Sequence, residues 1–273
     1  MRQLHDPSRR RALSALGAAI AASGCSGGIG SCSGGIGSIG FGAEAAGTPA
    51  ADGRLESRPP KTPPSTPSAV GAQPLGLDSG RDGAIYLPPG LSGPAPLLVL
   101  LHGATGSAAG ITKRTDAFAL ADELKIVILA PDSRGRTWDA IRGQYGPDVA
   151  FLDRALAKVF ALVAIDPKRV AIGGFSDGAS YAMSLALQNG DLFTHVAAFS
   201  PGFYIANVRR GRPMFWVSHG RDDEILPIDT TSRRLVPALE DAGYSVRYKE
   251  FKGPHTVPPE LARAAFAWIA GRK

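Results

Sequence analysis

The sequence contains few cysteines: Cys25 and Cys32 are the only two among 273 residues. Both precede the part of the chain with a core-forming pattern, so no disulfide is expected in the folded domain, which must be stabilised by its core alone. Long apolar runs are also missing, because the run at residues 12–22 has 11 residues and is too short to cross a bilayer as a helix. Basic residues give a net charge of +6 but do not cluster among aromatic ones, which argues against nucleic-acid binding.

The N-terminus has the pattern of an export signal. Residues 9–11 are three arginines, residues 12–22 are apolar, and small residues follow. Residues 8–13 resemble the twin-arginine export motif, with Ala12 in place of the bulky residue usual there. An ordinary secretory signal that contains three arginines is the alternative. Residues 1–25 are therefore predicted to direct export.

Cys25 directly follows this apolar run. The sequence Ala-Ser-Gly-Cys at residues 22–25 resembles a bacterial lipobox, in which the cysteine is acylated after cleavage, although Ala22 stands where leucine is more usual. The alternative is cleavage after Ala21, which would release a soluble secreted protein. We expect an exported protein, either an envelope lipoprotein anchored through Cys25 or a periplasmic or secreted one.

Residues 26–74 have the composition of a linker. Gly-Ser repeats give way to a Pro-Thr-Ser-rich stretch around residues 59–67. Such sequence cannot bury a core and is predicted to be disordered, with its proline-rich part semi-extended. The folded domain is accordingly expected at residues 75–273.

In this domain, apolar runs alternate with helical patterns. Continuous apolar runs of this kind are typical of strands buried on both faces of a mostly parallel sheet. The expected strands are residues 97–101, 126–130, 169–173, 214–218 and 245–251, and the expected helices include residues 149–163 and 179–189. The predicted fold class is α/β, with a mostly parallel central sheet, helices on both faces and functional loops at the carboxyl ends of the strands.

Residues 174–178 read Gly-Phe-Ser-Asp-Gly and lie between an expected strand and an expected helix. The two glycines permit a sharp turn that exposes the hydroxyl of Ser176, as in the nucleophile elbow of serine hydrolases. The pattern Gly-x-Ser-x-Gly alone is weakly specific, since it also occurs at residues 24–28 without a strand or helix. The prediction that Ser176 is a nucleophile therefore rests on the expected strand before it and the expected helix after it.

Two later loops supply an acid and a base. Asp222 and Asp223 follow the expected strand at 214–218, and His255 follows the one at 245–251. The order Ser, Asp, His is that of α/β-hydrolases, and His255 is the only histidine after the acid. A serine hydroxyl needs an imidazole to accept its proton and a carboxylate to orient that imidazole. Spacing alone does not distinguish Asp222 from Asp223.

His219 lies close to both aspartates in the sequence. The pattern His219-x-x-Asp222-Asp223 resembles a metal cluster faintly, but no second group of ligands appears. A strand-end histidine packed beside the catalytic acid is the favoured interpretation. No metal or cofactor is expected.

These motifs together resemble the small carboxylesterases of the α/β-hydrolase superfamily, a group that includes phospholipase/carboxylesterase, dienelactone hydrolase and polyhydroxybutyrate-depolymerase-like enzymes. The resemblance covers residues 81–270. It implies that Asp223, the second aspartate after His219-Gly, is the triad acid. It also implies an oxyanion hole formed by the backbone N–H groups of Ala104, which follows His-Gly, and Asp177.

Substrate recognition is the least specified feature. The connection between His195 and Met214 is too short for a helical lid, so an open cleft for small or polymer-borne esters is expected. Four aromatic residues are candidates for the substrate pocket, namely Trp138, Phe175, Phe203 and Tyr204. The main prediction is a serine carboxylesterase with an acyl-serine intermediate. A peptidase, thioesterase or acyltransferase with the same triad, and a non-catalytic envelope lipoprotein, are the alternatives.

Overall fold

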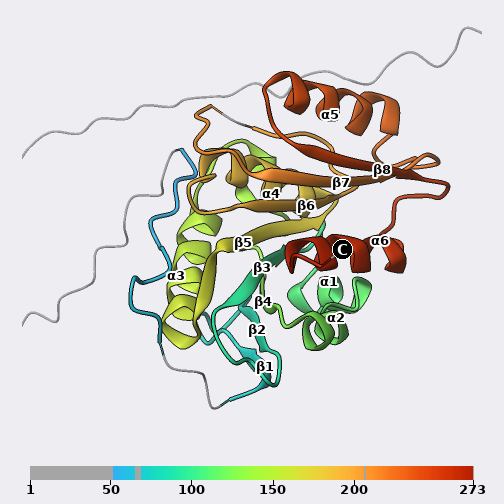
Figure 1. The fold of residues 1–273 in the computed structure, drawn as a ribbon. Coiled ribbons are helices and arrows are strands. Elements are labelled where there is room, and N and C mark those ends of the chain that lie inside the picture. Colours follow the sequence, from blue (N-terminus) through green and yellow to red (C-terminus); the bar gives the residue numbers. More distant parts are fainter. Residues whose placement is uncertain (1–51, 65–68, 206, 273) are drawn as a thin grey trace, which may run out of the picture. The chain divides into compact units, whose positions relative to one another are not determined.

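The computed structural model describes residues 52–64, 69–205 and 207–272. The chain divides into two units, Met1–Ala45 and Ala46–Lys273, and all described residues belong to the second. Eight strands form one sheet (Figure 1); they are β1 (Gly71–Pro74), β2 (Gly83–Leu87), β3 (Ala95–Leu101), β4 (Val127–Pro131), β5 (Ile165–Phe175), β6 (His195–Phe199), β7 (Met214–Gly220) and β8 (Val246–Phe251).

The strand order in the sheet is β1-β2-β4-β3-β5-β6-β7-β8. β1 and β2 pair antiparallel, β2 also runs antiparallel to β4, and every pair from β4 to β8 is parallel. The parallel strands end at the same edge of the sheet, so the loops that follow β3, β5, β7 and β8 gather there. The predicted α/β class with a mostly parallel sheet is confirmed.

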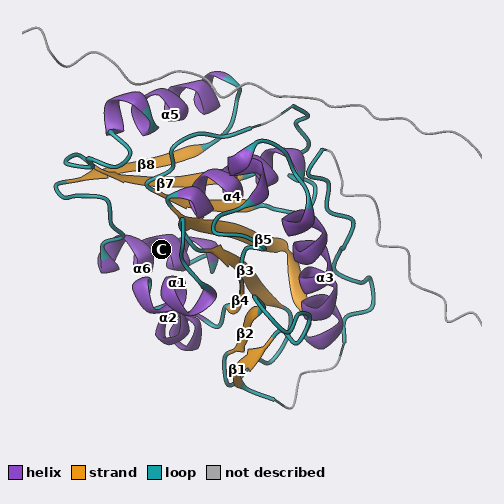
Figure 2. Ribbon diagram, turned by 180° about the vertical axis from the view of Figure 1, so that it is seen from behind, coloured by secondary structure: helices purple, strands orange, loops and turns teal. Residues whose placement is uncertain are grey.

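Helices cover both faces of this sheet (Figures 1 and 2). One face carries α3 (Pro147–Leu162), α4 (Asp177–Gln188) and α5 (Ser232–Asp241). The other carries α1 (Ala108–Arg114), α2 (Ala117–Leu124) and α6 (Pro259–Ile269). Two short 3₁₀ helices, η1 (Asp139–Arg142) and η2 (Ile228–Thr230), lie in the loops. Between β6 and β7 the described residues form no helix, in agreement with the absence of a lid there.

The sheet is buried because its central strands are apolar on both faces. All five residues of β4 and all five of β6 are buried, and alternate residues of β3 pack into different cores. Leu97, Val99 and Leu101 face α3 and α4, whereas Leu98 and Leu100 face α1 and α2. Successive side chains of a strand point to opposite faces of the sheet, and here each face packs against a core. Both sets of side chains must therefore be apolar, which explains the continuous apolar run.

The structure corrects the boundary expected at residue 75. Residues 52–64 are described and pack on the domain, with Leu55 fully buried. The side-chain amide of Asn189 accepts from Leu55 N (2.9 Å) and donates to the carbonyl of Gly53 (2.9 Å). Asp153 accepts from two further backbone N–H groups of this segment, and Arg54 forms an ion pair with Asp191 (2.6 Å).

Composition did not reveal this docking because a proline-rich segment that forms neither helix nor strand can still be held by partners from elsewhere in the chain. β1 likewise belongs to the sheet, although its residues fell within the expected linker. The predicted export signal, Cys25 and residues 26–51 of the linker lie outside the described residues. In the ranges that the structure does describe, none of the helices has the length and apolarity required to cross a membrane.

Candidate active site

Ser176 lies at the sharp turn between β5 and α4. Its backbone has φ 57° and ψ −120°, a conformation that a non-glycine residue rarely adopts and that is typical of strained functional positions. The turn is held by a hydrogen bond from Ser176 N to the carbonyl of Phe199 (2.9 Å) at the end of β6. The serine side chain is thereby kept at the carboxyl edge of the sheet.

The two glycines of the motif are required by the close approach of β3. A Cβ on Gly174 would lie 2.6 Å from the carbonyl oxygen of Leu101. A Cβ on Gly178 would lie 2.5 Å from the carbonyl oxygen of His102 and closer still to that of Leu101. These separations are far below an ordinary van der Waals contact, so the glycines allow the start of α4 to lie against the end of β3.

Asp223 and His255 are in direct contact. His255 Nδ1 lies 2.5 Å from Asp223 Oδ2. The other oxygen, Oδ1, accepts from the backbone N–H groups of Ile225 (3.0 Å) and Leu226 (2.8 Å). Burial raises the pKa of Asp223, but the Leu226 N–H and the His255 imidazole outweigh this effect and hold the pKa below its ordinary value. Asp223 is therefore ionised at neutral pH and fixes the orientation of the imidazole.

The ring of Phe175 brings His255 to the nucleophile turn. Phe175 directly precedes Ser176, and its ring centroid lies 4.5 Å from that of His255. Ser176, Asp223 and His255, which come from loops far apart in the sequence, thus lie at the same edge of the sheet. Asp222, the alternative acid, is exposed, whereas Asp223 is buried. The structure accordingly pairs His255 with Asp223.

His219 is a second histidine in contact with the acid. It is completely buried, its Nε2 lies 3.1 Å from Asp223 Oδ2 and 2.8 Å from the carbonyl of Leu226, and its Nδ1 lies 2.7 Å from the hydroxyl of Ser232. Burial lowers its pKa, so the ring is neutral. This geometry matches the interpretation of a strand-end histidine packed beside the acid. The described residues contain no group of three His, Cys, Asp or Glu side chains arranged to hold a metal.

Two backbone N–H groups are available next to Ser176. A Cβ on Gly103 would lie 3.3 Å from Ser176 Cβ, so the loop after β3 runs beside Ser176, and Ala104 directly follows Gly103. Within the described residues, neither Ala104 N nor Asp177 N donates to a protein acceptor. Asp177 N is also the first N–H of α4, where the helix dipole favours negative charge.

Trp138 supports the turn after β3 and does not line a surface pocket. It is fully buried, donates from Nε1 to the carbonyl of His102 (2.8 Å) and stacks on Tyr181. The substrate-pocket prediction for Trp138 is therefore corrected. His102 accepts from Ser133 N at Nε2 (3.0 Å), and its Nδ1 lies 2.7 Å from the carbonyl of Gly103, as expected for a neutral ring whose pKa is lowered by burial.

The other three aromatic candidates differ in exposure. Phe175 lines a cavity of about 130 Å³ together with Gly103 and Ala104. Phe203 is 37% exposed, and Tyr204 is half-buried against the core on the α3 side of the sheet. Of the four predicted pocket residues, Phe175 is the one that the structure places in a cavity with the Ala104 loop.

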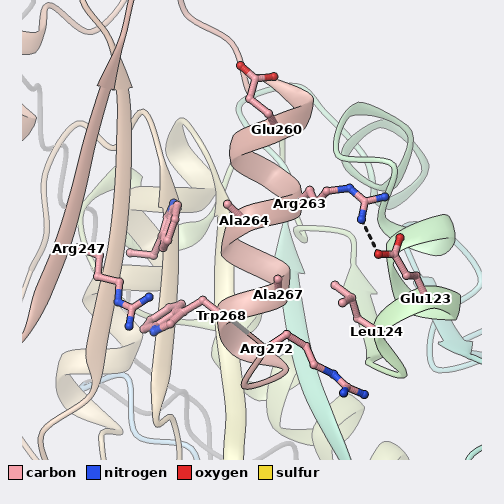
Figure 3. A pocket seen from close by; sticks show the side chains of 10 residues that line it. Glu123, Leu124, Arg247, Glu260, Arg263, Ala264, Ala267, Trp268 and Arg272 are labelled. Atoms are coloured by element: carbon pink, nitrogen blue, oxygen red, sulfur yellow. Dashed lines mark hydrogen bonds and ion pairs between the residues drawn. The ribbon is translucent and has the colours of Figure 1, made fainter.

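A larger cavity, of about 630 Å³, lies at α6 and contains none of the candidate catalytic residues. It is lined by residues of α2, α6, β7 and β8, among them Trp216 and, as Figure 3 shows, Trp268. Arg263 of α6 pairs there with Glu123 of α2. This cavity is larger than the one at Phe175, but the Ser176 turn and the Asp223–His255 pair lie elsewhere.

Comparison with known families identifies the family of the chain. Residues 76–243, more than half of the chain, match the family described as "Esterase: Putative esterase". The chain belongs to this esterase family. The predicted enzyme class, a hydrolase of carboxylic esters, is the class of the family, and the predicted resemblance is confirmed.

A curated relative has the same description. The "Putative esterase NocK" of Nocardia uniformis subsp. tsuyamanensis is 29% identical over 171 residues, which cover 58% of this chain and 48% of that protein. The chain thus spans about half the length of this relative.

Solved structures share the fold. The fluorophosphonate-binding serine hydrolase FphF of Staphylococcus aureus aligns with a TM-score of 0.58 at 15% identity, over 70% of this chain and 92% of that one. Esterase PE8 aligns with a TM-score of 0.56 at 22% identity, over 70% of this chain and 98% of that one. At these identities the likeness establishes the α/β-hydrolase fold.

Proposed function

We propose that this protein hydrolyses carboxylic esters through an acyl intermediate on Ser176. The observation that carries the proposal is the 2.5 Å contact between His255 and the buried, ionised Asp223, with the His255 ring packed on Phe175, the residue before Ser176. A hydroxyl becomes a strong nucleophile when an oriented imidazole accepts its proton. The esterase family of the chain supports ester substrates.

In the first half-reaction, Ser176 Oγ attacks the ester carbonyl while His255 takes its proton. Asp223 stabilises the imidazolium that forms. The N–H groups of Ala104 and Asp177 then donate to the oxyanion, and the start of α4 adds its dipole. His255 returns the proton to the alcohol as the C–O bond breaks, which leaves the acyl group on Ser176.

In the second half-reaction, water attacks the acyl group. His255 accepts a proton from this water and then returns it to Ser176 Oγ as the carboxylic acid leaves. Both half-reactions use the same imidazole and the same two N–H groups. The steps require only side chains and backbone groups of this chain together with water.

The test is hydrolysis of p-nitrophenyl esters, from acetate to palmitate, by the chain from Ala46 onward. Ser176→Ala should abolish turnover without changing the melting temperature, and a fluorophosphonate should label the native protein but not the variant. A short-chain optimum is expected, because the described residues between β6 and β7 form no helical lid. Folded native protein without turnover or labelling would refute the proposal and favour the non-catalytic alternative.

We further propose that the protein is exported and anchored to a membrane through lipidated Cys25. The support is sequence alone: a basic segment, an 11-residue apolar run at residues 12–22 and the lipobox-like Ala-Ser-Gly-Cys. In cells, Cys25→Ala should move the protein from the membrane fraction to the soluble fraction, whereas the matched Cys32→Ala should not. Unchanged fractionation of Cys25→Ala would contradict the anchor.

A further inference from the structure

Arg114 is a cation without a carboxylate partner at the candidate active site. It lies in the last turn of α1 and is exposed. Among the described residues, no carboxylate oxygen lies within 4.0 Å of its guanidinium, and its side chain donates no hydrogen bond. A cation at the end of a helix commonly only offsets the helix dipole. Arg114 differs because its guanidinium lies 4.8 Å from the ring centroid of Phe175, the residue before Ser176.

The same arginine lines the 130 Å³ cavity beside the nucleophile. Gly103, Ala104 and Phe175 form the side towards Ser176, and Gly110 and Arg114 of α1 lie on the helix side. A Cβ on Gly110 would meet only Ser107 Oγ, at 3.5 Å, so the space beside this glycine is largely open. The cavity is large enough to admit a carboxylate on a short chain.

We propose that this cavity is an anion subsite and that the preferred substrates are short esters bearing a carboxylate in their acyl or alcohol part. The inference rests on the proposed function. A guanidinium binds a carboxylate through two parallel N–H bonds and, being weakly hydrated, loses little on desolvation. Stacking on Phe175 restricts the side chain before substrate arrives, which reduces the entropy lost on binding. Phe175 also contacts His255, so only the Phe175 ring lies between an anion bound at Arg114 and the proposed catalytic base.

Lys113 provides a matched control on the same helix. It is exposed like Arg114, but it lines a different groove, together with Asp116 and Phe118. Removing the charge of Lys113 changes the net charge of the protein by the same amount as removing that of Arg114. A long-range electrostatic effect would therefore respond to both substitutions, whereas a subsite responds only to Arg114.

The experiment compares two isosteric ester pairs in a pH-stat. Ethyl valerate and monoethyl glutarate differ by a carboxylate in the acyl part, and butyl acetate and 4-acetoxybutanoate differ by one in the alcohol part. In one of the pairs the anionic ester should have a kcat/KM about twofold to fivefold higher, as expected for an ion pair with an exposed arginine. The preference should decrease when NaCl rises from about 0.02 M to about 0.5 M.

The variants show whether Arg114 causes this preference. Arg114→Gln should abolish it, mainly through a higher KM for the anionic ester, because binding of a remote carboxylate is the same in ground and transition states. Arg114→Lys should retain part of it and Lys113→Gln all of it. Equal rates for both members of both pairs in the native protein, or a preference that survives in Arg114→Gln, would overturn the proposal.

Binding without turnover separates this inference from the proposed function. Saturation-transfer NMR with Ser176→Ala should detect monoethyl glutarate or 4-acetoxybutanoate, and the signal should be lost in Ser176→Ala/Arg114→Gln. If the native protein hydrolyses none of the four esters but this binding is present, the hydrolytic function fails and the subsite stands. Equal binding of these two anions with and without Arg114 overturns the subsite whatever the turnover.

Discussion

Replacing Gly178 by alanine tests whether the nucleophile turn depends on the close approach of β3. The added Cβ would lie 2.5 Å from the carbonyl oxygen of His102, whereas ordinary contact begins at 3.4 Å. The start of α4 must therefore move by at least about 0.9 Å (3.4 − 2.5) relative to the end of β3, because the carbonyl oxygen of Leu101 lies closer still. Such overpacking costs about 1–3 kcal/mol, less than the usual stability of a domain, so the variant should fold.

The movement should be more damaging to catalysis than to stability. α4 carries Asp177 N, and the loop after β3 carries Ala104 N, so separating the two elements separates the two proposed oxyanion donors. A misplacement of about 1 Å costs on the order of 100-fold in rate. We expect Gly178→Ala to lower kcat/KM for p-nitrophenyl acetate by about this factor.

The assay pairs this rate with far-UV circular dichroism and thermal melting, so that misfolding is recognised. Gly93→Ala is the matched control, because a Cβ on Gly93 meets no atom within 4 Å. It adds the same methyl group and should leave kcat/KM unchanged. A folded Gly178→Ala with native kcat/KM would refute the argument that the glycine is required for the geometry of the site.

Three further predictions concern stability, pH and the catalytic acid. Leu55→Ala should lower stability by about 2–3 kcal/mol and the Tm by roughly 4–12 °C, because Leu55 is fully buried, whereas Val70→Ala, at a side chain 60% exposed, should not change the Tm. Burial raises the pKa of Asp148 to about 6 from 3.8, so the native state binds this proton more tightly than the unfolded state. The resulting stabilisation is complete below about pH 3.8 and is lost as the pH rises through 6. Between about pH 4 and pH 7 the free energy of unfolding of the native protein should therefore fall by on the order of 3 kcal/mol relative to that of Asp148→Asn, as measured by urea unfolding. Asp223→Asn should lower kcat about 10⁴-fold, whereas the exposed Asp222→Asn should leave it nearly unchanged.

Each of these has a contradicting result. An unchanged Tm for Leu55→Ala would mean that residues 52–64 contribute nothing to the fold. A stability difference between the native protein and Asp148→Asn that is the same at every pH would contradict the raised pKa. Equal losses of activity at Asp222 and Asp223 would contradict the role given to the buried carboxylate.

Much of the fold could be predicted because its determinants are local. The expected strand at residues 97–101 lies within β3 and that at 214–218 within β7, since strands buried on both faces read as unbroken apolar runs. The expected helix at 149–163 corresponds to α3, Pro147–Leu162. β1 was not predicted because its four residues are half exposed and pair at the sheet edge.

Some residues of the candidate site could likewise be predicted from local sequence, and others could not. Ser176, Asp223 and His255 each stand in a short motif at a strand end, so their loops could be expected to converge at one edge of a parallel sheet. Trp138 was misassigned because an aromatic residue in a loop gives no sign of whether it faces solvent or core. Its burial depends on His102 and Tyr181, which come from separate parts of the chain.

By itself, the sequence determined five of the eight strands of the sheet, the turn at Ser176 and the order of serine, aspartate and histidine. These features depend on side-chain periodicity and on neighbours within a few residues. Only the tertiary structure decided that residues 52–64 dock on the domain, that Asp223 is buried while Asp222 is exposed, and that Arg114 reaches Phe175. Each of these depends on contacts between segments distant in the sequence, and such contacts form only when the sheet and its helices assemble.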